Sequence, residues 1–405
     1  MKIVLFTSIV LLPILSSCDS LLPQAPDAEE VLAEPIPDLT DAQLASHIAG
    51  DEEFGRVFSP EEGLGPLFVS ASCESCHIGD GKGHPVTNLT RFGRMHDGTY
   101  SALEDLGGPQ LQHRSIPGYP AEEIPAEATG ITRLMPPAVT GLGYLEAIED
   151  ASILTLADPD DSDGDGISGV PSWIENPDFL PAPVDRVQND GKVIGRFGKK
   201  AGAINLLHQT VVAYLQDMGV TTEFLPQDTY NVQAGIQTGD TASDPEISTE
   251  IVNNVVFYLR TLKVPPRRNA EDENVQAGER IFSDIGCAGC HVTALMTGPS
   301  DVEALSNKTI FPYSDLLLHD MGPELDDGYT EGSATSSEWR TAPLWGIGLA
   351  ADSQGGRAFY LHDGRATTLD EAIQYHGGEA ALSRDRYANM SSDEQAQLIA
   401  FLMSL

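Results

Sequence analysis

Apolar residues gather in short runs along the chain, with long polar stretches between them. Two of these runs, residues 255–262 (VVFYLRTL) and 398–405 (LIAFLMSL), predict buried helices. Each run follows a segment rich in glycine and proline, residues 136–143 (PPAVTGLG) in the first half and 342–348 (APLWGIG) in the second. The chain therefore contains an internal repeat, and we expect a mainly α fold with short helices, long loops and little sheet.

Another apolar run, residues 3–15, follows a lysine at the N-terminus. It is too short to span a bilayer as a stable helix and has the layout of an export signal. Residues 15–18 (LSSC) resemble a bacterial lipobox, which implies a signal peptide over residues 1–17 and lipid on Cys18. An ordinary secretory signal with an incidental cysteine is the alternative.

Residues 19–40 are rich in Pro, Ala, Asp and Glu and lack helical periodicity, so we interpret residues 18–45 as a lipidated tether. The expected location is a membrane-anchored lipoprotein that faces the periplasm or the cell exterior. It would contact the membrane through its lipid alone.

Charge excludes one large class of partner. Sixty-one acidic residues against 23 Lys and Arg give the 405-residue chain a net charge of −38, which repels phosphate backbones and argues against nucleic-acid binding. The 41% of apolar residues are enough to build a core. Cationic partners, metal ions or a saline exterior suit such a surface.

Four of the five cysteines lie in two C-x-x-C-H motifs, residues 73–77 (CESCH) and 287–291 (CAGCH). In an exported chain this pattern predicts covalent c-type haem, because two thiols form thioethers and the adjacent imidazole ligates iron. A single copy is also compatible with a disulfide, half a zinc site or a redox pair. Two copies without further cysteines favour two haems, held by Cys73, Cys76, His77, Cys287, Cys290 and His291.

The repeat and the two motifs divide the chain into two units. We expect a cytochrome-c-like haem domain at residues 46–265 and a second at residues 270–405, each closed by one of the two apolar helices. The boundary falls at residues 263–272, where a Pro-Pro-Arg-Arg sequence and an acidic run predict a linker.

From about residue 68 onward the chain resembles the di-haem oxidoreductase family, within the bacterial di-haem cytochrome c peroxidase superfamily. The resemblance rests on residues 141–148 (GLGYLEAI), 195–198 (GRFG), 317–322 (LLHDMG), 339–346 (WRTAPLWG) and 362–365 (HDGR). It implies one haem that relays electrons and a second, open haem that meets peroxide.

The resemblance also implies a sixth iron ligand in the second unit, fourteen residues after a His-Asp-Gly turn. His376 stands fourteen residues after His362 in this sequence, so we expect His291 and His376 to ligate the second haem together. Histidine in place of the usual methionine should lower the reduction potential. A surface position for His376, with Met321, His319 or Met390 as ligand, is the alternative.

For the peroxide pocket, the resemblance points to a glutamine and a carboxylate on one helix. Gln209 and Asp217 match this frame with a shortened spacing, as a hydrogen-bond donor to peroxide and a proton shuttle. A helix with both residues exposed is the alternative, and Glu146 is the competing proton donor. His84, His96 and His208 are further candidate ligands of the first iron or loop histidines.

One position departs from the family. Lys199 stands where a tryptophan generally lies between the haems, and an ammonium group cannot carry a transient oxidation. Trp173, Trp339 and Trp345 are the candidates to replace it.

Residues 158–169 (DPDDSDGDGISG) place carboxylates at alternate positions around glycines, an arrangement that suits calcium. The pattern matches the first half of an EF-hand loop, with Asp161, Asp163 and Asp165 as ligands, but Ser172 replaces the closing glutamate. A solvated acidic turn is the alternative.

We therefore expect a peroxidase-like di-haem c-type enzyme. Its partners would be an electron-donor protein or small redox carrier, and hydrogen peroxide or another small oxidisable substrate. Electrons would pass from the C-terminal haem to the N-terminal haem. A non-catalytic di-haem electron-transfer lipoprotein and a haem oxygenase-type or protein-modifying oxidase are the alternatives. Related peroxidases are often dimers, so a homodimer is compatible with the resemblance.

Overall fold

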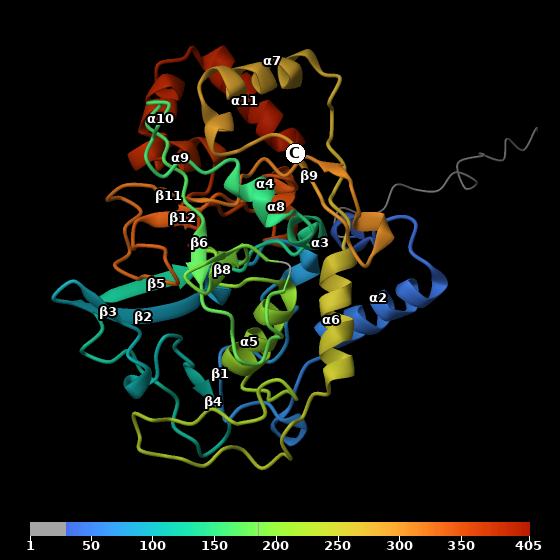
Figure 1. Cartoon of the computed structure of the whole chain (residues 1–405), viewed down its shortest axis with the longest axis vertical. Coiled ribbons are helices and arrows are strands. Elements are labelled where there is room, and N and C mark those ends of the chain that lie inside the picture. Colours follow the sequence, from blue (N-terminus) through green and yellow to red (C-terminus); the bar gives the residue numbers. More distant parts are fainter. Residues whose placement is uncertain (1–29, 185) are drawn as a thin grey trace, which may run out of the picture.

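The computed structural model describes residues 30–184 and 186–405, and the chain forms short helices joined by long loops (Figure 1). Cys18 and the predicted signal peptide lie outside the described residues. The helices are α1 (Glu30–Ala33), α2 (Asp41–Phe54), α3 (Leu142–Glu146), α4 (Asp150–Leu154), α5 (Leu206–Met218), α6 (Thr249–Thr261), α7 (Glu273–Asp284), α8 (Ala350–Ser353), α9 (Leu369–Gln374), α10 (Ala381–Ala388) and α11 (Ser392–Ser404).

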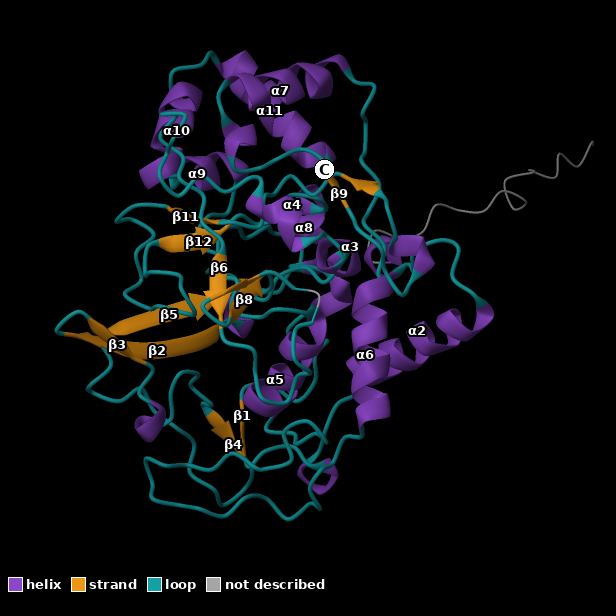
Figure 2. Ribbon diagram, in the orientation of Figure 1, coloured by secondary structure: helices purple, strands orange, loops and turns teal. Residues whose placement is uncertain are grey.

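Strands pair into small antiparallel sheets between these helices (Figure 2). One three-stranded sheet has the order β3-β2-β5 and another the order β6-β8-β7, and three further pairs join β1 with β4, β9 with β10 and β11 with β12. The strands are β1 (Leu67–Phe68), β2 (Leu89–His96), β3 (Thr99–Ser101), β4 (Arg114–Ser115), β5 (Gly130–Leu134), β6 (Ser172–Ile174), β7 (Gln188–Asn189), β8 (Lys192–Gly195), β9 (Leu295–Met296), β10 (Thr309–Ile310), β11 (Leu318–Asp320) and β12 (Glu338–Arg340).

The expectation of a mainly α fold with little sheet needs correction. The structure is 32% helix and 14% strand, so the fold is mixed. Most strands have two to five residues, and even the alternation of buried and exposed residues along β5 covers only five positions. A period of two over so few residues gives no usable sequence signal, because strand pairing depends on partners elsewhere in the chain.

The internal repeat is visible as two helix pairs. Helix α6 packs on α2 in the first half, and α11 packs on α7 in the second. Each pair makes its close approach at a glycine: a Cβ on Gly50 of α2 would clash with α6, and one on Gly278 of α7 would clash with α11. The predicted apolar helices at 255–262 and 398–405 thus fall in α6 and α11 and pack as the repeat indicates.

Side-chain caps set the start of all four helices. Thr40 and Ser391 form capping boxes at α2 and α11. The Ser248 side chain accepts a hydrogen bond from the backbone N–H of the third residue of α6, and the Asp272 side chain accepts hydrogen bonds from backbone N–H groups in the first turn of α7. The predicted linker at residues 263–272 joins α6 to α7. The first hydrophobic core also takes in Trp345 from the second half, so the division into two domains stays a prediction.

The described part of the predicted tether is folded. Ile36 is buried and its N–H donates to the carbonyl of Thr261, while Pro35 pairs with Leu262. The chain is therefore packed on α6 well before residue 45. Within the residues that the structure describes, no helix is both long and apolar enough to cross a membrane.

Candidate functional site

A cavity of about 640 Å³ receives both C-x-x-C-H motifs. Its wall includes all four of their cysteines, both of their histidines and much of α5, together with residues of α9 and the loop after β12. The two motifs, 214 positions apart in the sequence, thus share one mostly apolar interior.

The two motif histidines are oriented in the same way. His77 Nδ1 lies 2.8 Å from the carbonyl oxygen of Pro137, and His291 Nδ1 lies 2.8 Å from that of Tyr313. Because a carbonyl can only accept, Nδ1 carries the proton and the Nε2 lone pair is free for a metal. Burial lowers the pKa of each imidazole to about 4, so both are neutral at physiological pH.

His376, near the C-terminal end of the chain, has the same orientation. It follows α9, lines the cavity, and its Nδ1 lies 2.8 Å from the carbonyl oxygen of Ala372. Burial lowers its pKa, and it is close enough to His291 to lower that pKa as well. His376 is therefore a partly buried, neutral imidazole with a free Nε2 near the second motif.

The other candidate histidines differ from this pattern. His84 Nδ1 accepts from Val86 N at 3.2 Å, and His208 Nδ1 accepts from Ile204 N at 3.3 Å, which places the proton of the neutral ring on Nε2. In that tautomer Nε2 has no lone pair for iron. His96 is exposed on β2, outside the cavity wall.

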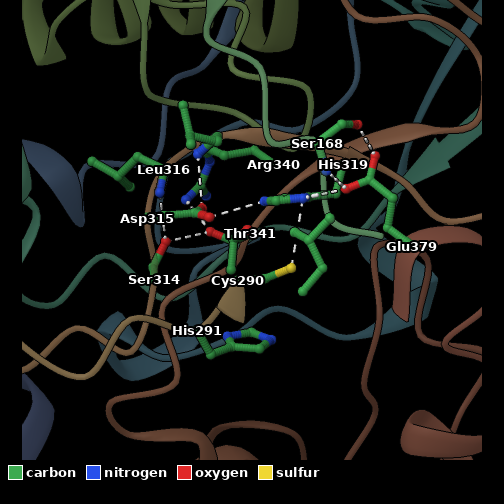
Figure 3. Close-up of polar contacts among 12 residues, drawn as sticks. Ser168, Cys290, His291, Ser314, Asp315, Leu316, His319, Arg340, Thr341 and Glu379 are labelled. Atoms are coloured by element: carbon green, nitrogen blue, oxygen red, sulfur yellow. Dashed lines mark hydrogen bonds and ion pairs between the residues drawn. The ribbon is translucent and has the colours of Figure 1, made fainter. Parts of the chain in front are cut away.

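Two of the three alternatives to His376 are less well placed. His319 has a carboxylate oxygen within 2.9 Å of each ring nitrogen, so neither nitrogen is free (Figure 3). Met390 packs against the second hydrophobic core and is not part of the cavity wall, whereas Met321 lines the cavity.

Gln209 and Asp217 both line the cavity from α5. Asp217 Oδ1 accepts from Gln110 Nε2 at 2.6 Å, and poor solvation raises the pKa of its carboxyl to about 6. Asp217 also lies near the first motif, because burial and then its charge raise the pKa of Cys73 to about 12. The exposed-helix alternative does not describe these two residues.

Glu146 is placed elsewhere. It is not part of the cavity wall; it pairs with Arg260 and accepts the N–H of Leu206, the first residue of α5, at 2.8 Å. A carboxylate at a helix N-terminus and against an arginine is a structural arrangement. Its geometry does not favour a role as proton donor in the cavity.

The cavity contains cations despite the acidic chain. Lys82, Lys199 and Arg340 all line it. Loss of solvation lowers the pKa of Lys82 to about 8 and of Arg340 to about 10, and holds that of Lys199 well below its usual range, with Lys82 and Arg340 repelling it further. Poorly solvated cations of this kind require anions.

Haem suits both the poorly solvated cations and the neutral imidazoles of this cavity. Its propionates would supply the missing anions, and its iron would meet imidazoles with a free Nε2. The residues that would hold two such groups are His77 with Cys73 and Cys76, and His291 with Cys287 and Cys290. Sequence reasoning missed Lys82 and Arg340, since isolated basic residues in loops carry no pattern.

Two tryptophans lie on the cavity wall. Trp345 and Trp339 line it, and Trp339 stacks on His362 with ring centroids 3.7 Å apart, while Lys200 Nζ lies 3.7 Å from its ring centroid on the aromatic face. Trp173 lies on β6 and is not part of the wall. Of the three candidates to replace the aromatic group at position 199, two are thus in the shared interior.

The acidic loop brings together Asp158, Asp161 and Asp163, whose carboxylate oxygens lie within 4.8 Å of one another. Asp165, also predicted as a ligand, instead accepts the N–H of Ile167 at 2.8 Å. The pattern of alternating carboxylates therefore locates the cluster, but its third member is Asp158 where the sequence predicts Asp165.

A shared interior with two haem motifs and inward-facing imidazoles defines a protein that holds two haems for redox chemistry. The chain belongs to the family described as "Di-haem oxidoreductase, putative peroxidase", whose model matches residues 22–94 and 129–405. It is therefore a di-haem oxidoreductase, as the resemblance indicates.

More distant likenesses add little. No curated protein matches the chain. Among solved structures it is similar to hydrazine synthase of Kuenenia stuttgartiensis, pressurised with 20 bar xenon, with 16% identity, a TM-score of 0.40, and coverage of 100% of this chain and 99% of that one. A MauG-like protein associated with microbial copper homeostasis gives 15% identity, a TM-score of 0.38, and coverage of 95% and 94%.

Proposed function

We propose that this oxidoreductase is peroxidase-like: the haem at His77 is the reactive one, and the haem at His291 relays electrons to it. The observation that carries the proposal is the unequal supply of imidazoles. Among the cavity-lining histidines that the structure describes, those with Nδ1 on a backbone carbonyl are His77, His291 and His376. The second site thus has a pair and the first has one.

When bound, haem supplies reversible one-electron chemistry and an iron that accepts an oxygen ligand. Reduction of hydrogen peroxide to two waters consumes two electrons and two protons, and this chain must move the protons. Asp217, with a pKa near neutrality, can take a proton from one peroxide oxygen and return it to the other. Gln209, on the same helix, can orient the peroxide by a hydrogen bond.

At the second site, the paired imidazoles would leave no open iron position and would favour a low potential. Such a haem exchanges electrons without binding substrate. Trp345 and Trp339, on the wall of the shared cavity, are the candidate aromatic groups between the two sites. The donor would be a protein or small carrier, and a basic one suits the charge of −38.

Electron paramagnetic resonance of the haem-loaded protein tests the proposal. We expect one high-spin haem and one low-spin bis-imidazole haem in at least one redox state, and turnover of hydrogen peroxide in that state. His376→Ala should convert the second haem to a high-spin form and leave the first signal unchanged. Two low-spin haems in every redox state, with no reaction with peroxide, would instead favour the electron-transfer protein.

Three further expectations are part of this proposal. The carboxylates of Asp158, Asp161 and Asp163 would bind calcium, and covalent thioethers would hold both haems. Lipid on Cys18 would anchor the enzyme to a membrane on the periplasmic or outer side. Mass spectrometry of the mature chain tests the thioethers and the lipid, because each adds a fixed mass at its cysteine.

A further inference from the structure

His319 of the LLHDMG sequence has no role in the proposed chemistry, yet its surroundings are unusual. The side chain is buried on β11, and both of its nitrogens face carboxylates: Nδ1 lies 2.7 Å from Glu379 Oε2 and Nε2 lies 2.9 Å from Asp315 Oδ2 (Figure 3). A carboxylate can only accept, so both nitrogens carry protons and the ring is an imidazolium. These contacts raise the pKa of His319 to about 12.

The two carboxylates are themselves fixed. Glu379 Oε1 accepts from Ser168 Oγ at 2.7 Å and from Asp320 N at 3.1 Å, and Asp315 Oδ1 accepts from Leu317 N at 2.9 Å. Neither side chain can rotate away without losing these bonds. The geometry of the ring is therefore determined from both sides.

This cation stands at the second haem motif. His319 Nδ1 lies 3.5 Å from Cys290 Sγ, and His319 lines the cavity beside Cys290 and His291. Of the three charged groups in the cluster, the imidazolium is the one in contact with the sulfur. At the first motif, in contrast, the Asp217 carboxyl is the group that raises the pKa of both cysteines after burial.

The cluster also joins the second motif to the acidic loop of the first half. Ser168 donates both its N–H and its hydroxyl to Glu379, and Val170 and Leu318 exchange backbone hydrogen bonds of 2.9 and 2.8 Å. A Cβ on Gly289, inside the motif, would clash with Ile167 of the loop. The loop and the haem-attachment turn are thus packed directly on each other.

We infer that His319 is a positioning residue of the second haem: its fixed positive charge raises that haem's reduction potential, and its carboxylate partners tie the attachment turn to residues 167–170. A nearby cation favours the reduced haem, because reduction lowers the charge of the iron by one. The inference rests on the proposed haem at His291, but on neither peroxide chemistry nor the direction of electron flow.

Potentiometric titration of the haem-loaded, full-length protein tests it, with each haem followed by its own spectrum. His319→Gln should lower the potential of the second haem by at least the 59 mV that corresponds to a tenfold change in a one-electron equilibrium. Glu379→Gln removes a negative charge from the same cluster and should shift the potential in the opposite direction. The first haem should keep its potential in both variants.

Glu273→Gln is the matched control, since it neutralises an exposed carboxylate on α7 and should change neither potential. Unchanged potentials in both cluster variants, or shifts in the same direction, would overturn the inference. If His319→Gln fails to bind haem, the inference is tested by the shift of the second haem's potential in Glu379→Gln and in Asp315→Asn. A lowered or unchanged potential in these variants contradicts the inference. A negative result together with the expected His376→Ala spectrum would leave the proposed function intact.

Discussion

The two haem motifs are alike in how their histidines are oriented, and they differ in the ionisable side chain that lies nearby. In each, Nδ1 of the motif histidine lies 2.8 Å from a backbone carbonyl oxygen. A phenylalanine ring also lies near each imidazole, with ring centroids 6.0 Å apart for Phe54 and His77 and 6.3 Å apart for Phe282 and His291. Near the second motif is His376, an imidazole whose pKa is lowered by burial; near the first is Asp217, a poorly solvated carboxyl. In the proposed function this difference assigns the relay role to the second haem and the reactive role to the first.

The largest expected effect concerns Asp217, near the first motif, where we propose the reactive haem. Asp217→Asn keeps the acceptor oxygen for Gln110 but cannot take a proton, so the rate of reaction with hydrogen peroxide should fall by roughly 10²–10⁴-fold. Stopped-flow absorption with the haem-loaded protein measures this rate. Glu146→Gln is the comparison: it should lower the unfolding temperature, because the pair with Arg260 is lost, and spare the peroxide rate. The reverse outcome would assign the proton transfer to Glu146.

The next effect concerns His376, the proposed second ligand of the haem at His291. His376→Met replaces an imidazole with a weaker donor and should raise the second haem's potential by on the order of 0.1 V, a fraction of the roughly 0.8 V that axial ligands span. Spectroelectrochemical titration gives the value, and a charge-transfer band at the red end of the oxidised spectrum would show the methionine bound. His96→Met, at an exposed site on β2, should change nothing. An unaltered potential in His376→Met would remove His376 from the iron.

The pH dependence sharpens the same contrast. Because poor solvation raises the pKa of Asp217 to about 6, its proton-accepting ionised form is lost as the pH falls through 6. The peroxide rate should therefore be level above this value and fall about tenfold per unit well below it. Asp217→Asn should lack this break, whereas a break shared by both proteins would point to another group.

The smallest effect concerns the acidic loop. If calcium binds Asp158, Asp161 and Asp163, a free concentration 100-fold above the dissociation constant stabilises the folded state by about 2.7 kcal/mol. Thermal unfolding with calcium and with a chelator measures the difference, and Asp161→Asn should reduce it. Asp190→Asn, at an exposed turn, serves as control. Because the loop packs on the second motif, calcium should alter the second haem's spectrum more than the first; equal changes would contradict that packing.

The haem-attachment motif of each site and the helices around it could be predicted from the sequence. The C-x-x-C-H spacing, the capped helices and the apolar runs at 255–262 and 398–405 are local patterns, and the structure has α6 and α11 where the runs predict them. The mixed fold could not be predicted from the sequence, because strands such as β1 and β4 have two residues each and exist through partners 46 to 48 positions away. The part of the presumed tether that the structure describes is folded for a similar reason, since Ile36 is fixed by Thr261.

By itself, the sequence determined the two haem motifs, their place in a repeat, and the family to which the chain belongs. The tertiary structure decided which side chains face the shared cavity, that Asp217 does and Glu146 does not, and that His319 is a charged ring rather than a free ligand. The reason is physical: covalent spacing fixes residues three positions apart, whereas the state of an imidazole or a carboxyl depends on hydrogen-bond partners and solvent exclusion. Pro137, the partner of His77, and Glu379, one of the two partners of His319, each lie 60 residues away, and folding alone brings them within 3 Å.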